Sequence, residues 1–315
     1  MLYLTDGEIE RLVTISEVVE SLREVFTQLD EQTASVVPRT RVNAKSGMLD
    51  MMGAVSDVWD LAAVKSYYIN DGVLNFHLVL FAVREAEPVA IMQARKLGQL
   101  RTGAASGLAT DKLSIRNAKT MGCIGTGYQA EAQVDAVISV RPIETILIHS
   151  RKTENMKKFG KMIRERHDVD VIELDNVFPG FAEADVISCA TDSTIPVLGI
   201  KSMGHQCHIN AVGGYRPDMV EVEPELISSC MTVVADLKKQ AMNESGELIS
   251  AVESGKLSWD EVDEMKDINA GRVHRRSNAS TECTFFKSLG VAVEDLAAAK
   301  IVYDAALSRG AGREL

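Results

Sequence analysis

Apolar side chains recur at helical spacing over the first thirty residues of the chain. This pattern predicts one N-terminal helix, which Thr5 and Asp6 can cap and which Val37-Pro38 ends. From about residue 41 to residue 92, short apolar runs alternate with turn residues, as is typical of strands in a sheet. The predicted strands cover residues 48–52, 62–68, 77–83 and 88–92, with Asn70-Asp71-Gly72 as a turn.

A different pattern begins with residues 94–112, which are rich in Ala, Leu and Gly and predict a tightly packed helix. Beyond it, short apolar runs alternate with helical segments. Strands are predicted at residues 120–124, 145–149, 169–172, 184–189, 208–212 and 232–236, and helices at 130–140 and 156–166. This alternation predicts a parallel sheet that is covered on both faces. A last helix, at about residues 292–307, is expected to return to the first part of the chain.

Composition narrows the class of protein. The 315 residues correspond to about two domains of roughly 150 residues, and 46% hydrophobic residues are enough to fill a core in each. Lys and Arg number 34 against 45 Asp and Glu, so the net charge is −11, and neither nucleic acid nor an anionic membrane is expected as a partner. The chain has no apolar run of the roughly 18 residues that a membrane span needs, and its first ten residues contain acids where a signal peptide has a basic end and an apolar core. Its five cysteines include no Cys-x-x-Cys pair. We therefore expect a cytoplasmic protein with reduced, buried thiols.

A glycine turn supplies the strongest local motif. The run Gly125-Thr126-Gly127-Tyr128-Gln129-Ala130 lies between a predicted strand and a predicted helix. In that setting the glycines permit a tight turn and the close approach of a pyrophosphate, whose charge is met by amides at the helix N-terminus. The sequence therefore predicts a dinucleotide site.

The end of the next predicted strand bears on the choice of dinucleotide. A site for NAD(H) would place Asp or Glu there to hold the ribose hydroxyls, but this chain has Ser150, Arg151 and Lys152. Arg and Lys can pair with a 2′-phosphate, so NADP(H) is the preferred cofactor and NAD(H) the alternative. The other interpretation is that these residues are solvated charges at the end of a strand.

Three basic residues occur in apolar or glycine-rich surroundings. Lys65 interrupts an apolar stretch, Arg101 lies in the glycine- and alanine-rich helix, and Arg41 opens the strand region. Buried cations need anionic partners, and the guanidinium fork matches a carboxylate. Each alone suits an ordinary salt bridge; together they suit a clamp for an acidic substrate.

The histidines have structural interpretations. The segment His205-Gln-Cys-His208 crowds three potential ligands into four residues, which is poor geometry for zinc, so no metal site is predicted. His77, within an apolar run, is predicted to be a hydrogen-bonded core residue.

Seven segments together resemble the motifs of the ornithine cyclodeaminase/mu-crystallin family. They cover nearly the whole chain and comprise residues 38–42, 63–65, 100–106, 124–130, 183–187, 208–214 and 286–295. The resemblance implies an α/β homodimer in which a Rossmann NAD(P)-binding domain, residues 114–289, is inserted into a smaller α+β domain. That smaller domain, residues 1–113 plus 290–315, would bind substrate and form the dimer.

The resemblance also implies site residues. Lys65, Arg41 and Arg101 would surround the substrate carboxylate in front of the nicotinamide, and Arg39 is close enough to compete with Arg41 for that role. The cofactor would be bound by Thr102, Gly125, Thr126, Gly127, Tyr128, Gln129, Ser150, Arg151, Lys152, Thr191, Val212 and Ser288.

One departure from the family indicates the branch. Cyclodeaminases and alanine dehydrogenases of this family carry a catalytic Asp where this chain has Tyr215, and the following Arg-Pro-Asp looks more like the ketimine (pyrroline-2-carboxylate) reductase branch. Oxidation of an amino acid needs a base, whereas a protonated C=N already attracts hydride and chiefly needs orientation. Tyr215 and Asp218 are auxiliary candidates for the active site. If Asp218 or Glu221 replaces the missing Asp, cyclodeaminase activity remains an alternative hypothesis.

The resemblance therefore predicts an NAD(P)-dependent oxidoreductase that acts on C–N bonds. It would reduce a small α-imino acid, such as Δ1-pyrroline-2-carboxylate or Δ1-piperideine-2-carboxylate, to an L-amino acid. The enzymatic alternatives are ornithine cyclodeaminase and alanine dehydrogenase. The alternative from another class is a crystallin-like NADP-binding protein with little turnover.

Overall fold

The chain divides into two compact units. The computed structural model describes residues 1–70, 73–204 and 206–315, so Asp71, Gly72 and His205, which belong to the predicted turn and histidine segment, lie outside the described residues. Unit 1 consists of Met1–Ala105 and Gly290–Leu315, and unit 2 of Ser106–Leu289. The division falls inside helix α3 (Arg95–Leu113), whereas the sequence suggests a boundary at the end of that helix.

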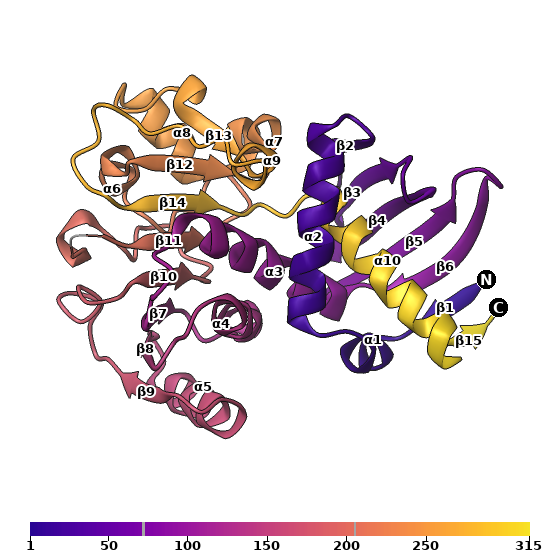
Figure 1. Cartoon of the computed structure of the whole chain (residues 1–315), viewed down its shortest axis with the longest axis horizontal. Coiled ribbons are helices and arrows are strands. Elements are labelled where there is room, and N and C mark those ends of the chain that lie inside the picture. Colours follow the sequence, from indigo (N-terminus) through magenta and orange to yellow (C-terminus); the bar gives the residue numbers. More distant parts are fainter. Residues whose placement is uncertain (71–72, 205) are drawn as a thin grey trace. The chain divides into compact units, whose positions relative to one another are not determined.

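Unit 1 is built on one seven-stranded sheet with the strand order β15-β1-β6-β5-β4-β3-β2 (Figure 1). Strands β2 to β6 form an antiparallel meander, and β1 joins β6 in parallel. Helix α10 (Ala292–Arg309) packs on α2 and on strands β2, β3 and β4. The strands are β1 (Leu2–Leu4), β2 (Ala34–Ala44), β3 (Gly47–Ser56), β4 (Leu61–Asn70), β5 (Val73–Ala82), β6 (Glu87–Gln93) and β15 (Arg313–Glu314).

The prediction of a single N-terminal helix is wrong, because the chain forms α1 (Asp6–Leu12) and α2 (Ile15–Asp30). Each helix begins with its own capping box, since Thr5 pairs with Glu8 and Thr14 with Glu17. Pro38 does not end the helix either. It lies in β2, at a register shift where an edge strand tolerates the missing N–H.

Side chains alternate between the two faces of the unit 1 sheet. On β3, Asp50 and Met52 are buried on one face, whereas Met51 between them is 37% exposed. The other face carries a group of exposed apolar side chains, Val37, Val42, Met51, Val64 and Tyr68. His77 of β5 is exposed, so the prediction of a core histidine is wrong: the alternation buries its neighbour Leu78 instead.

Unit 2 is an eight-stranded parallel sheet with the order β13-β12-β14-β11-β10-β7-β8-β9 (Figure 1). The chain proceeds from β7 through β8 to β9 on one side and then returns to β10 on the other, so a topological switch point lies between β7 and β10. The strands are β7 (Thr120–Ile124), β8 (Thr145–His149), β9 (Asp170–Glu173), β10 (Val186–Cys189), β11 (His208–Ala211), β12 (Thr232–Ala235), β13 (Val262–Glu264) and β14 (Thr284–Lys287).

The helices of unit 2 include α4 (Tyr128–Val140), α5 (Thr153–Arg166), α6 (Pro224–Ser229), α7 (Lys238–Glu244), α8 (Gly246–Glu253) and α9 (Met265–Asn269), with the 3-10 turns η1 (Ile200–Ser202) and η2 (Trp259–Glu261). The predicted Rossmann-type sheet is confirmed, and its strands β10, β11, β12 and β14 are buried throughout. All five cysteines are free and buried. In the described part of the chain, no helix is long and apolar enough to cross a membrane, and no cluster of His, Cys, Asp or Glu could hold a metal ion.

Candidate functional site

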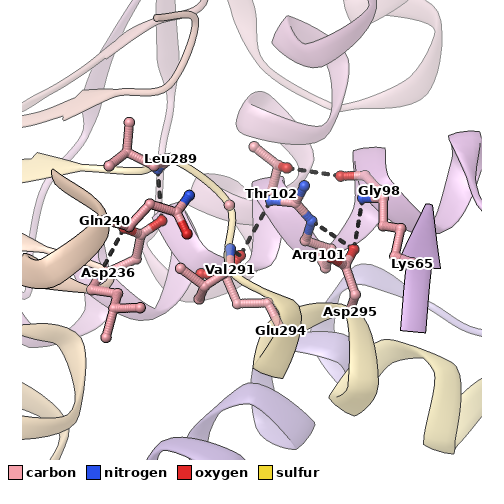
Figure 2. Close-up of polar contacts among 12 residues, drawn as sticks. Lys65, Gly98, Arg101, Thr102, Asp236, Gln240, Leu289, Val291, Glu294 and Asp295 are labelled. Carbon is pink, nitrogen blue, oxygen red and sulfur yellow. Dashed lines mark hydrogen bonds and ion pairs between the residues drawn. The ribbon is translucent and has the colours of Figure 1, made fainter. Parts of the chain in front are cut away.

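A buried ionic cluster in unit 1 brings together two of the predicted substrate-binding cations. Lys65 Nζ of β4 lies 2.9 Å from Asp295 Oδ1, and Arg101 Nε of α3 lies 3.1 Å from the same oxygen (Figure 2). A second guanidinium nitrogen of Arg101 lies 3.2 Å from Glu294 Oε2. The residues of this Lys65–Arg101 cluster are almost fully buried, so each cation has the anionic partner that its burial demands.

The start of α10 places the two carboxylates. Glu294 and Asp295 lie in the first turn of the helix, where the helix dipole favours negative charge. Gly290, just before that turn, has φ +74°, and a Cβ atom there would lie 2.2 Å from a nitrogen of Arg101. A glycine at residue 290 therefore permits the close approach of Arg101 to the helix.

Burial and neighbouring charges shift the pKa values in this cluster. Burial, reinforced by the cations Arg101 and Arg39, lowers the pKa of Lys65 to about 8, although Asp295 opposes the shift. Burial works against ionisation of Asp295, but Lys65 and Arg101 outweigh it and hold the pKa of Asp295 below its ordinary value. Lys65 is therefore an ammonium ion at neutral pH that gives up its proton readily.

A second pair lies on β2 and β3 of the same unit. Arg41 Nε lies 3.3 Å from Asp50 Oδ1, across two residues that are paired in the sheet. Asp50 is fully buried, with the guanidinium of Arg41 and the hydroxyl of Tyr67 beside its carboxylate. Arg39 donates to the carbonyl oxygen of Gly290 at 3.2 Å, beside Arg101. Arg39 and Arg41 therefore both stay candidates for binding the substrate carboxylate.

Sequence reasoning missed the three carboxylates of this site. The sequence did contain a signal for Asp50, which interrupts the apolar run 48–52 just as Lys65 interrupts its own. A second signal was the Glu294-Asp295 pair behind a glycine at a helix start, which is a favourable place for acids.

The glycine turn of unit 2 has the geometry of a pyrophosphate site. Gly125 follows β7 with φ +97°, and a Cβ there would lie 2.4 Å from the carbonyl oxygen of Ala190. Gly127 is the N-cap of α4, provides no side-chain cap for its first amides, and has no atom within 4 Å of the position of a Cβ. These residues therefore fit the phosphates of a nicotinamide dinucleotide, which would lie against the exposed amides at the N-terminus of α4.

The basic residues after β8 include one with an acidic partner. Arg151 is exposed, and one of its terminal nitrogens lies 2.8 Å from Asp192 Oδ1. Because β8 and β10 flank β7, this exposed pair joins the loops on either side of the glycine turn. Ser150 precedes Arg151, and Lys152 is the N-cap of α5.

The remaining cofactor candidates differ in their surroundings. Tyr128 is exposed, whereas the hydroxyl of Ser288 and the amide oxygen of Gln129 are buried without a hydrogen-bond partner among the described residues. Thr191 and Val212 follow β10 and β11 at the carboxyl ends of the strands. Thr102 lies in the part of α3 that belongs to unit 1, and its hydroxyl donates to Gly98 at 2.8 Å (Figure 2).

The loop after β11 does not present an obvious catalytic carboxylate. Asp218 is exposed and pairs with Arg216, whose hydrogen bonds lower the pKa of Asp218 and make it a weaker base. Tyr215 lies beside the same guanidinium, 5.8 Å from ring centre to carbon. Glu221 is fully buried, and its carboxylate accepts hydrogen bonds from backbone amides.

Comparisons with known proteins find similarity to one family along nearly the whole chain. The family described as ornithine cyclodeaminase/mu-crystallin is matched by residues 2–310. The chain is 31% identical over 326 aligned positions to a Delta(1)-pyrroline-2-carboxylate reductase of Bacillus cereus, covering 100% of this chain and 99% of that protein. The structure of the Thermococcus litoralis Delta(1)-pyrroline-2-carboxylate reductase in complex with NADH and L-proline has a TM-score of 0.93 at 30% identity and covers 100% of both chains. An archaeal alanine dehydrogenase dimer with bound NAD has a TM-score of 0.91 at 28% identity, covering 100% of this chain and 98% of that one.

Proposed function

The chain belongs to the ornithine cyclodeaminase/mu-crystallin family, and we propose that it reduces a cyclic α-imino acid to the corresponding L-amino acid with NADPH or NADH. It is an NAD(P)-dependent oxidoreductase of the imine-reducing kind, with Δ1-pyrroline-2-carboxylate and Δ1-piperideine-2-carboxylate as the proposed substrates. The observation that carries the proposal is the buried Lys65–Arg101 cluster, which concentrates cationic groups in an acidic protein.

The charges of unit 1 suit one substrate carboxylate. The cations Arg39, Arg41, Lys65 and Arg101 outnumber the nearby carboxylates Asp50, Glu294 and Asp295. The arginines provide forked donors that match a carboxylate, and Arg101 is already held in place by its two acidic partners. Asp50, a fully buried carboxylate beside Arg41, would face the positive charge of a protonated imine.

The reduction adds a hydride to carbon and a proton to nitrogen. When bound, the nicotinamide supplies the hydride. Lys65 would fix the substrate carboxylate or relay the proton, because a group with a pKa of about 8 is protonated at neutral pH and still acidic enough to transfer a proton. The absence of a free carboxylate at residue 215 supports reduction of a preformed imine over oxidation of an amino acid.

The basic residues after β8 support a preference for NADPH. Arg151 and Lys152 follow the strand whose end faces the adenosine ribose in Rossmann folds, and a guanidinium can pair with a 2′-phosphate. The similar structures that contain NADH or NAD support the use of NADH as well. Asp192 offsets part of the positive charge of Arg151, so the proposed preference for NADPH over NADH is a small one.

The exposed apolar face of the unit 1 sheet supports a homodimer. Val37, Val42, Met51, Val64 and Tyr68 lie exposed on three adjacent strands, an arrangement typical of a surface that another protein covers. A second copy of the chain is the proposed partner, in line with the dimeric alanine dehydrogenase. The five free, buried cysteines support a cytoplasmic location.

One panel of assays tests the proposed activity. NADPH and NADH oxidation is followed at 340 nm with pyrroline-2-carboxylate, piperideine-2-carboxylate, and pyruvate plus ammonia; ornithine is tested for the formation of proline and ammonia. We expect rapid oxidation with a cyclic imino acid. Turnover of ornithine alone, without any reaction of the cyclic imines, would overturn the proposal. The alanine dehydrogenase relative makes pyruvate plus ammonia the second candidate reaction.

A further inference from the structure

A buried carboxylate ties two loops of unit 2 together. Glu221 Oε1 accepts from the amide of Thr191 at 2.6 Å and from its hydroxyl at 2.8 Å. Glu221 Oε2 accepts from the amides of Gly213 at 2.6 Å and Gly214 at 3.3 Å. All four groups are donors, so their arrangement fits an ionised carboxylate.

The two loops lie at the carboxyl ends of adjacent strands. Thr191 follows β10 and Gly213 follows β11, beside the switch point between β7 and β10. Ala190, the residue before Thr191, is the close neighbour that forces a glycine at residue 125 in the pyrophosphate turn. Gly213 packs as tightly, since a Cβ there would lie 1.9 Å from the carbonyl oxygen of Thr191. Glu221 therefore fixes backbone that borders the proposed cofactor site.

A second buried pair supports the carboxylate from behind. The amide of Glu221 donates to Glu247 Oε1 at 3.3 Å, and Lys287 Nζ lies 3.0 Å from the same oxygen. Both partner side chains are fully buried, and Lys287 Nζ would lie 3.2 Å from a Cβ at Gly214. The cation thus compensates for negative charge in a region without water access.

We propose that Glu221 is a positioning residue for the dinucleotide: its carboxylate holds the Thr191 and Gly213–Gly214 loops in the conformation that receives the cofactor. This inference rests on the proposed function. Glu221 does not need to touch the reacting atoms. Its full burial distinguishes it from a catalytic base, which has to exchange protons with the substrate or with water. Its role is to keep four donors of two loops on one acceptor group.

The titration of Glu221 provides a signature for this role. Burial raises the pKa of Glu221 to about 7, Lys287 opposes the shift, and Glu247 adds to it. The titratable groups that face it are Glu247 of α8, Lys287 of β14 and the buried thiol of Cys189 at the end of β10. Protonation would turn an O–H toward a set of donors, so the loops lose part of their anchorage as the pH falls through about 7.

The test measures the dissociation constant of NAD⁺ by calorimetry between pH 6 and pH 8. For the wild type we expect the Kd to rise as the pH falls. For Glu221→Gln we expect a Kd raised about tenfold at pH 8 that no longer depends on pH, because an amide leaves two of the four donors facing its NH2 group. The KM for the imino acid, measured at saturating cofactor, should change less than about twofold.

Asp185→Asn is the matched control. Asp185 immediately precedes β10, at the amino end of that strand, and its carboxylate accepts from the backbone amides of Lys119 at 2.7 Å and Thr120 at 3.0 Å. This variant should bind NAD⁺ as the wild type does. If Glu221→Gln does not fold, the wild-type pH series alone decides the matter. Tight binding that is unaffected by both pH and Glu221→Gln would overturn the inference but leave the proposed function intact, whereas a wild type that binds no dinucleotide would overturn both.

Discussion

Two ion pairs of nearly equal length occupy very different surroundings in this protein. Lys65 and Asp295 are 2.9 Å apart and 3% and 1% exposed, whereas Arg151 and Asp192 are 2.8 Å apart and 79% and 81% exposed. Removing one partner of a buried pair leaves an uncompensated charge, while an exposed pair exchanges readily with water. The distance between the charges therefore says little about their energetic weight.

The difference in burial matches the proposed tasks. A buried cation with fixed partners keeps its geometry before the substrate arrives, which is what orientation of a reacting group requires. An exposed pair can open at little cost, so Arg151 can leave Asp192 for a phosphate of the cofactor. Variants at the two pairs should accordingly differ in both the size and the kind of their effects.

The largest effect is expected for Lys65→Met. This change removes the ammonium but keeps the length of the side chain, so kcat/KM for the imino acid should fall about a thousandfold. The dissociation constant of NAD⁺ should stay within about twofold, because the glycine turn belongs to unit 2. Steady-state kinetics and calorimetry on the same sample measure the two quantities. A crystallin-like binder would show no turnover to lose.

Asp295→Asn tests the anion of the buried pair. The amide leaves Lys65 and Arg101 without a shared charge, so the free energy of unfolding should fall by about 3 to 5 kcal/mol, as urea denaturation would measure. The pKa of Lys65 should fall further, because Asp295 is the group that raises it. Lys158→Ala, which breaks an exposed pair with Glu154 on α5, is the control and should change stability little. Equal losses in the two variants would contradict the contrast between buried and exposed pairs.

The pKa of Lys65 predicts a pH limb. The folded-state pKa of about 8 lies below the ordinary value, so the ammonium is present below pH 8 and lost above it. As a result, kcat/KM should fall toward tenfold per pH unit above about pH 8. Lys65→Arg stays charged, so its residual activity should lack this limb. Titration of the substrate imine affects both proteins alike, and an identical limb in both would assign it to the substrate instead of Lys65.

The sequence was informative where a residue conflicts with its immediate neighbours. Lys65 in an apolar stretch and the glycines of residues 125–127 were identified on that basis, and the alternating segments predicted the parallel sheet. Local pattern could not pair Lys65 with Asp295, because 230 residues separate them and only the return of α10 brings them together. The same limit hid the link between Glu221 and Thr191.

Short or polar segments carry too little pattern to be predicted from the sequence. Strand β13 has three residues, two of them acidic, and β14 ends in the buried Lys287, so neither shows the apolar run that marks its neighbours. The break between α1 and α2 was missed for a different reason. Val13 is buried like the helix residues around it, and only the capping box at Thr14 marks the new start.

Asp192→Asn should have the smallest effect and sharpens the contrast most directly. Without the carboxylate, Arg151 is available to the 2′-phosphate that NADPH carries and NADH lacks, so kcat/KM should rise about threefold for NADPH and stay nearly constant for NADH. Arg151→Ala should move the ratio the other way. Because both side chains are exposed, the gain in kcat/KM for NADPH should shrink when the salt concentration is raised to about 0.5 M, since salt screens surface charges. A change of equal size with both cofactors would show that Asp192 acts on the fold of the loop and not on the phosphate, and the exposed pair would then resemble the buried one after all.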